Sequence, residues 1–134
     1  MTSVLGPGIP LVVDTSAWTR QRRAVDAWRA TNKAGLLASC PVAALEIFLT
    51  ARNEREYQAL SANLDRLLQA PVTAAVCRSA LAACRDLKGS RRIPAPDYLI
   101  AAAAAERGFG VLHADRHFDL LATVLPFESV HLPE

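Results

Sequence analysis

The segment around which this chain is organised reads Ile9-Pro10-Leu11-Val12-Val13-Asp14-Thr15-Ser16-Ala17-Trp18. A short apolar run ends at an acid, and two hydroxyl residues follow before the sequence becomes compatible with a helix. This pattern predicts a buried strand that carries a carboxylate at its C-terminal end, the edge at which open α/β sheets bind ligands. The alternative is that Asp14, Thr15 or Ser16 only caps the next helix, since all three residue types cap well.

The same arrangement recurs near the end of the chain, in Gly110-Val111-Leu112-His113-Ala114-Asp115. Strand and helix patterns alternate between these two segments, and few hairpin signals separate them. This order predicts the α/β class, with a mostly parallel sheet between two layers of helices. Further strands are expected at 36–40, near residue 72 and at 127–132. Helices are expected at 24–33, 41–52, 53–69, 74–87, 95–107 and 116–123.

Composition limits the functions that the chain can have. Its 134 residues suit one globular domain with residues 1–9 as a tail, and the net charge of +2 is too small to indicate nucleic-acid binding by itself. Three scattered cysteines form no metal or disulfide framework, which suits a reducing compartment. No signal peptide or membrane span is evident. We therefore expect a soluble, cytoplasmic protein.

Four acids are candidates for one site. Asp14 and Asp115 each follow a strand, and Asp97 lies in the first turn of a helix, where the helix dipole alone would favour it. Glu46 borders an apolar helical face predicted from Val42, Leu45, Phe48 and Leu49. The alternative for Glu46 is a surface residue that pairs with Arg52. All four acids can reach the same edge of the sheet.

Such a cluster has a chemical consequence. Two carboxylates ~5 Å apart repel by ~3 kcal/mol at an effective dielectric constant near 20. Without a cation they would bind protons or move apart. Hard divalent ions such as Mg²⁺ bind carboxylates and water, whereas zinc prefers histidine and cysteine. The acids therefore point to metal-assisted phosphodiester hydrolysis.

The segments around these acids resemble the motifs of PIN domains, and specifically of VapC-type toxins. Residues 11–18, 41–46, 96–101 and 111–119 occur in the family's order and at its spacing. The resemblance covers about residues 10–132. It implies a PIN-like three-layer α/β/α sandwich and an endoribonuclease that requires Mg²⁺ or Mn²⁺ and cuts structured RNA such as tRNA or rRNA. It also implies a homodimer that is inhibited by a VapB-type antitoxin.

By the same resemblance, Asp14, Glu46, Asp97 and Asp115 would be the catalytic, metal-binding acids, and the hydroxyl of Thr15 or Ser16 would assist them. Many relatives have a further acid two residues after the fourth, where this chain has His117. Asp119 could replace that acid in part, although its spacing differs. The histidine pair His113 and His117 is four residues apart, but a strand–helix junction between them disfavours zinc binding. We expect His117 at the edge of the site and a structural role for His131.

Basic residues flank two of the acids, on loops that could bind RNA phosphates. They are Arg20, Arg22 and Arg23 after the first acid and Lys88, Arg91 and Arg92 before the third. Two other function classes remain open. One is a receiver-like domain in which an aspartate accepts a phosphoryl group, and the other is a PIN-like interaction module without activity.

Overall fold

The computed structural model describes residues 2–88 and 92–134. Within these ranges, five strands form one sheet in the order β3-β2-β1-β4-β5. Every pair of neighbouring strands is parallel, which confirms the predicted α/β class. The strands are β1 (Leu11–Val13), β2 (Leu37–Ser39), β3 (Leu68–Gln69), β4 (Gly110–His113) and β5 (Glu128–His131).

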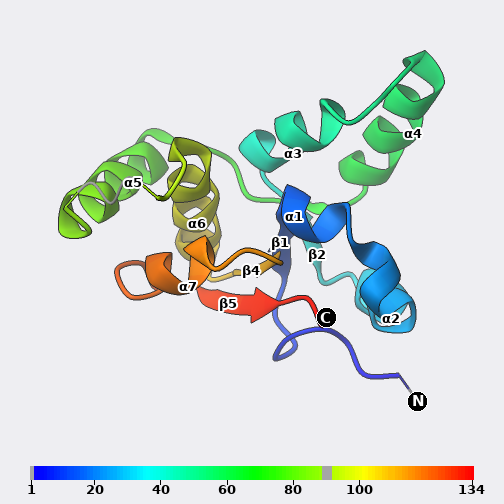
Figure 1. Cartoon of the computed structure of the whole chain (residues 1–134), viewed down its shortest axis with the longest axis horizontal. Helices are drawn as coiled ribbons and strands as arrows, with labels where there is room; N and C mark the ends of the chain where they lie inside the picture. The colour runs from blue at the N-terminus through cyan, green and yellow to red at the C-terminus, as the bar shows by residue number, and fades with distance from the viewer. Residues whose placement is uncertain (1, 89–91) are drawn as a thin grey trace.

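Helices cover both faces of the sheet, as Figure 1 shows. They are α1 (Thr15–Trp18), α2 (Val25–Lys33), α3 (Pro41–Phe48), α4 (Glu54–Asp65), α5 (Ala74–Asp86), α6 (Ala95–Arg107) and α7 (His117–Leu121), with the 3-10 helix η1 (Gln21–Ala24) before α2. Pro41 opens α3 and Thr73 caps α5, as the sequence predicted. Among the described residues, no helix is long and apolar enough to cross a membrane.

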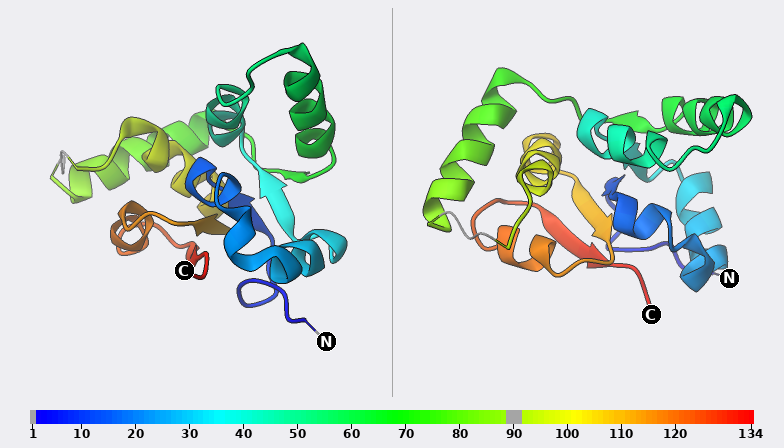
Figure 2. Two further views of the ribbon diagram at one scale, coloured as in Figure 1. Left: turned by 45° about the vertical axis from the view of Figure 1, so that its right-hand side comes forward. Right: turned by 45° about the horizontal axis from the view of Figure 1, so that its top comes forward.

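Alternation along the central strands creates two separate cores. Val12 and Val111 point to the larger core, which they form with α3, α5, α6 and α7. Leu11, Val13 and Leu112 point to the opposite face, against α1, α2 and the N-terminal segment. Figure 2 shows the sheet between these two groups of helices. The molecule is therefore a three-layer sandwich whose central strands are buried on both faces.

Four local predictions were wrong. The expected strand at Val72 does not form, because the edge strand β3 occupies Leu68–Gln69 instead. The helix predicted at 53–69 therefore ends at Asp65. The helix predicted at 41–52 ends at Phe48, and its buried residues are Ala43 and Ile47. The side chains of Leu45 and Leu49, predicted to be inward, are 66% and 85% exposed.

Strand order also tests the receiver-like alternative that the sequence left open. Receiver domains have the order 2-1-3-4-5, in which the first strand pairs with the third. Here β1 pairs with β2 and β4, and β3 lies at the edge beyond β2. The receiver-like alternative is therefore wrong for this chain.

Candidate active site

The carboxyl ends of β1 and β4 are held together by hydrogen bonds. Asp14 follows β1 directly, and its backbone N–H donates to the carbonyl of Leu112 at 2.9 Å. Its side-chain atom Oδ2 accepts from both the N–H and the hydroxyl of Ser16. The Ser16 hydroxyl oxygen in turn accepts the N–H of Ala114 at 2.9 Å. Asp14 therefore caps α1 and also lies beside the loop that carries Asp115. It is both a helix cap and a carboxylate at the edge of the sheet.

Asp97 reaches the same edge from the first turn of α6. Its side chain is buried, and burial raises its pKa to about 6 with help from the nearby charges of Asp14 and Asp115. A hydrogen bond to His117 opposes this shift but does not cancel it. Asp97 is therefore close enough to two other carboxylates for each to disfavour its ionised form.

His117 lies between two of the acids. Its Nδ1 atom is 3.1 Å from Oδ2 of Asp97 and 3.1 Å from Oδ1 of Asp115. Its backbone N–H also donates to Oδ1 of Asp115 at 3.0 Å. His117 was expected at the edge of the site. Its ring instead lies between the third and fourth acids and bridges their carboxylates.

Glu46 lies on α3, which packs against α1 and α6. Burial raises its pKa, and the negative charge of Asp14 acts in the same direction. Its Oε1 atom and the Thr15 hydroxyl are buried, and neither has a hydrogen-bond partner within residues 2–88 and 92–134. Two unpaired buried oxygens beside mutually repelling carboxylates fit a site for an oxygen-bound cation such as Mg²⁺ or Mn²⁺.

Asp119 does not join this group. Its carboxylate accepts from the Ser129 hydroxyl at 2.8 Å and bonds to Nε2 of His131 at 2.8 Å. The expectation that Asp119 replaces the missing acid was therefore wrong. His131, expected to be structural, belongs to this second cluster with His113. His113 and His117 thus lie in different clusters, which removes the possibility of a zinc site that contains both.

The predicted basic residues differ in their surroundings. Arg20 donates to the carbonyl of Ser16 at 2.9 Å and so contacts the end of α1. Arg22 and Arg23 are exposed in η1, and Lys88 is exposed after α5. Arg91 lies outside the described residues.

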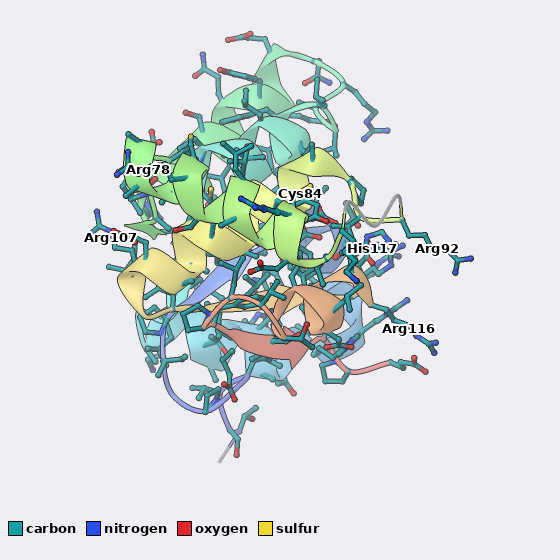
Figure 3. All side chains as sticks on the ribbon, turned by 90° about the vertical axis from the view of Figure 1, so that its left-hand side faces the viewer. Arg78, Cys84, Arg92, Arg107, Arg116 and His117 are labelled. Carbon is teal, nitrogen blue, oxygen red and sulfur yellow. The ribbon has the colours of Figure 1, made fainter. Side chains whose placement is uncertain are left out.

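Figure 3 shows exposed Arg92 at the same end of the molecule as His117. Arg116, which the sequence analysis missed, extends at that end too. Its position directly after Asp115 was the available signal.

Sequence reasoning also missed the cluster around His113. This side chain is fully buried, and its Nε2 atom lies 2.7 Å from the Ser129 hydroxyl oxygen. The parallel register pairs His113 of β4 with His131 of β5. Ser129 and His131 are two residues apart and share one face of β5. That spacing was a signal, but it becomes informative only when β5 is known to neighbour β4.

Two ribonucleases are similar to this chain in sequence. Ribonuclease VapC51 of Mycobacterium tuberculosis (strain ATCC 25618 / H37Rv) is 41% identical over 105 residues, covering 77% of this chain and 74% of that protein. Ribonuclease VapC18 of the same strain is 34% identical over 119 residues, covering 84% and 87%.

Two solved toxin–antitoxin structures have similar folds. For VapBC-5 from Mycobacterium tuberculosis, the TM-score is 0.64 at 23% identity, covering 94% of this chain and 100% of that one. For DNA-bound VapBC from Salmonella typhimurium, the TM-score is 0.72 at 13% identity, covering 92% and 98%. At these identities the structures support the fold alone. The family model described as PIN domain matches residues 11–124. The chain therefore belongs to the PIN domain family, and its α/β/α sandwich is the PIN-like fold.

Proposed function

We propose that this chain is an endoribonuclease that requires Mg²⁺ or Mn²⁺ and acts as the toxin of a toxin–antitoxin pair. One observation carries the proposal. Asp14, Glu46, Asp97 and Asp115 come from four separate segments. Burial raises the pKa of both Glu46 and Asp97, and the negative charge of Asp14 adds to both shifts. A folded protein keeps such repulsion where a cation offsets it. The similarity to ribonucleases VapC51 and VapC18 supports RNA as the substrate.

In this proposal the four acids hold the ion, and neighbouring groups orient them. A bound divalent ion would supply positive charge that stabilises the oxygens of a phosphodiester under attack by water. The Ser16 side chain and N–H fix Oδ2 of Asp14. The backbone N–H of His117 fixes Oδ1 of Asp115, and its ring bonds to Asp97. The remaining carboxylate oxygens of these acids would be available to hold the ion.

The partner proposals rest on the same relatives. The solved VapBC structures support a VapB-type antitoxin as the inhibitor of this chain. Exposed apolar side chains of Leu45 on α3, of Leu49 directly after α3 and of Leu81 on α5 offer surface for an antitoxin or a second copy in a homodimer. We further propose one PIN domain over most of the chain, a cytoplasmic location, and tRNA or rRNA as the substrate class.

A second candidate is a PIN-like interaction module that has lost activity. One observation favours it: His117, not a fifth acid, lies against Asp97 and Asp115. A module of this kind would keep the fold and the antitoxin surface but would not cleave RNA. Cleavage by the purified protein separates the two candidates.

The test compares the parent with Asp14→Asn on total RNA, in Mg²⁺, in Mn²⁺ and in EDTA. Asparagine can still cap α1, so the variant should fold normally. We expect metal-dependent cleavage by the parent and a loss of about 100-fold in the variant, as when a metal site is damaged. Asp65→Asn, an exposed change on α4, is the matched control. Cleavage in EDTA, or equal cleavage by Asp14→Asn, would contradict the proposal.

A further inference from the structure

His113, the last residue of β4, is hydrogen-bonded at both ring nitrogens. The backbone N–H of Asp115 donates to Nδ1 at 3.1 Å, and Nε2 lies 2.7 Å from the Ser129 hydroxyl oxygen. A backbone amide can only donate, so Nδ1 must present its lone pair. In a neutral imidazole the proton then belongs to Nε2, which donates to Ser129. An imidazolium would carry a proton on both nitrogens, so the lone pair at Nδ1 also means that the ring is neutral.

The chain of hydrogen bonds continues away from the site. Because the Ser129 oxygen accepts from His113, its own proton is directed to Oδ1 of Asp119 at 2.8 Å. The other oxygen of Asp119 accepts from His131 at 2.8 Å. Burial alone would raise the pKa of Asp119, but its hydrogen bonds to His131 and Ser129 outweigh this, and the pKa is lowered. The Asp115 N–H can only donate and the Asp119 carboxylate can only accept. Together they fix the direction of each hydrogen bond between them.

We propose that His113 is a positioning residue that holds the backbone of Asp115, and that Ser129 and Asp119 keep His113 in the required Nε2–H tautomer. Two successive amides are then fixed, since Ala114 donates to Ser16 and Asp115 donates to His113. This arrangement directs the Asp115 carboxylate to the other acids. The role rests on the proposed function, because positioning Asp115 matters only if it binds the ion.

A metal site is the competing interpretation of the same cluster. One donor atom each from His113, Asp119 and His131 lie within 4.8 Å of one another, a donor set that suits zinc. Coordination through Nε2 of His113 would place the ring proton on Nδ1, facing the N–H of Asp115. Two donors cannot share that contact. The observed bond from Asp115 therefore favours a hydrogen-bond relay, which runs from the Asp115 N–H through His113 and Ser129 to Asp119, over the metal site.

The tautomer can be measured without any enzymatic activity. Two-bond ¹H–¹⁵N correlation spectra of the metal-free protein near pH 7 distinguish a protonated from an unprotonated ring nitrogen. We expect a protonated Nε2 and an unprotonated Nδ1 in His113. A proton on Nδ1 would overturn the positioning role. So would Zn²⁺ that binds at one equivalent and shifts the resonances of His113 and His131.

Ser129→Ala tests the function of the relay, because it removes the acceptor of His113 but leaves the ring in place. We expect Mn²⁺ to bind about 10-fold more weakly and kcat to fall by a similar factor, with KM for RNA little changed. Ser129→Thr keeps the hydroxyl and should restore both values. Glu128→Gln, an exposed change on the same strand, is the matched control and should resemble the parent.

The outcomes separate this inference from the proposed function. Equal Mn²⁺ affinity and equal kcat in Ser129→Ala and the parent would refute the positioning role and leave the nuclease proposal intact. A parent that neither binds Mn²⁺ nor cleaves RNA would refute the proposed function and the positioning role with it. In that case an Nε2–H tautomer would still show that the hydrogen bonds run as described.

Discussion

Asp97 shows how the position of one residue determines the pKa of its carboxyl group. It lies buried in the first turn of α6, where the helix dipole favours a carboxylate. Burial and the charges of Asp14 and Asp115 act against ionisation, and the pKa rises to about 6. Burial and the surrounding negative charge together outweigh the contact with His117. A helix-capping role alone would have lowered this pKa.

The raised pKa of Asp97 predicts how its charge affects stability in the metal-free protein. Between about pH 4 and pH 6 the folded state holds a proton that the unfolded state has lost, so this group's contribution falls as pH rises. Buried His113, with its pKa lowered to about 4, acts in the opposite direction over an overlapping range. Because the two effects overlap, the quantity to measure is the difference in unfolding free energy between the parent and Asp97→Asn.

Urea denaturation in EDTA at several pH values measures that difference. The unfolding free energy of Asp97→Asn minus that of the parent should rise by on the order of 2 kcal/mol from pH 4 to pH 6. Asp86→Asn, an exposed change on α5, should show no such trend. A parent–variant difference that is constant with pH would mean that Asp97 titrates normally.

At the scale of elements, the close contact between the central strands and β5 constrains one glycine. A Cβ atom at Gly110 would lie 2.8 Å from the carbonyl oxygen of Glu128 and 2.8 Å from Cδ2 of Leu11. Gly110→Ala should therefore force the strands apart and cost about 1–3 kcal/mol. Urea denaturation of the parent and the variant measures this cost. An unchanged midpoint would show that the sheet tolerates a side chain there.

The loops before α6 and α7 carry Arg92 and Arg116. Arg92 and Arg116 extend at the His117 end of the molecule, whereas Arg78 and Arg107 lie toward the other end in the view of Figure 3. Arg92→Ala with Arg116→Ala should lower the salt dependence of RNA binding by about 0.7 per lost phosphate contact. Arg78→Ala with Arg107→Ala is the charge-matched control. If the affinity for RNA depends equally on salt in the two double variants, Arg92 and Arg116 have no specific role in binding RNA.

Elements with clear apolar patterns and end signals were predictable from the sequence, whereas elements without them were not. Strands β1 and β4 and the helix α6 combine clear apolar patterns with end signals such as Gly108, which adopts a left-handed conformation at φ 69°. Strand β3 has two exposed residues, Leu68 and Gln69, so no pattern separates it from the end of a helix. In α3, periodicity identified apolar positions but could not reveal which of them the rest of the chain covers.

For the whole molecule, strand order explains why the acids converge. Neighbouring β1 and β4 bring Asp14 and Asp115 together, and α3 and α6 add Glu46 and Asp97. The sequence suggested Asp14, Asp97 and Asp115 because each sits at the end of an element, and Glu46 because it borders an apolar helical face. The bridging position of His117 and the cluster around His113 depend on contacts between segments, which no local pattern encodes. Those parts of the site required the structure.

The central claim is that the four carboxylates hold a divalent ion, and proton release on binding tests it most directly. Mn²⁺ can be titrated calorimetrically near pH 6 in buffers of different ionisation enthalpy, into the parent and into Glu46→Gln. Because burial and Asp14 raise the pKa of Glu46, the parent should release protons as the ion binds. The variant should bind more weakly and release fewer. Equal affinity and equal proton release in the two proteins would contradict the four-carboxylate site.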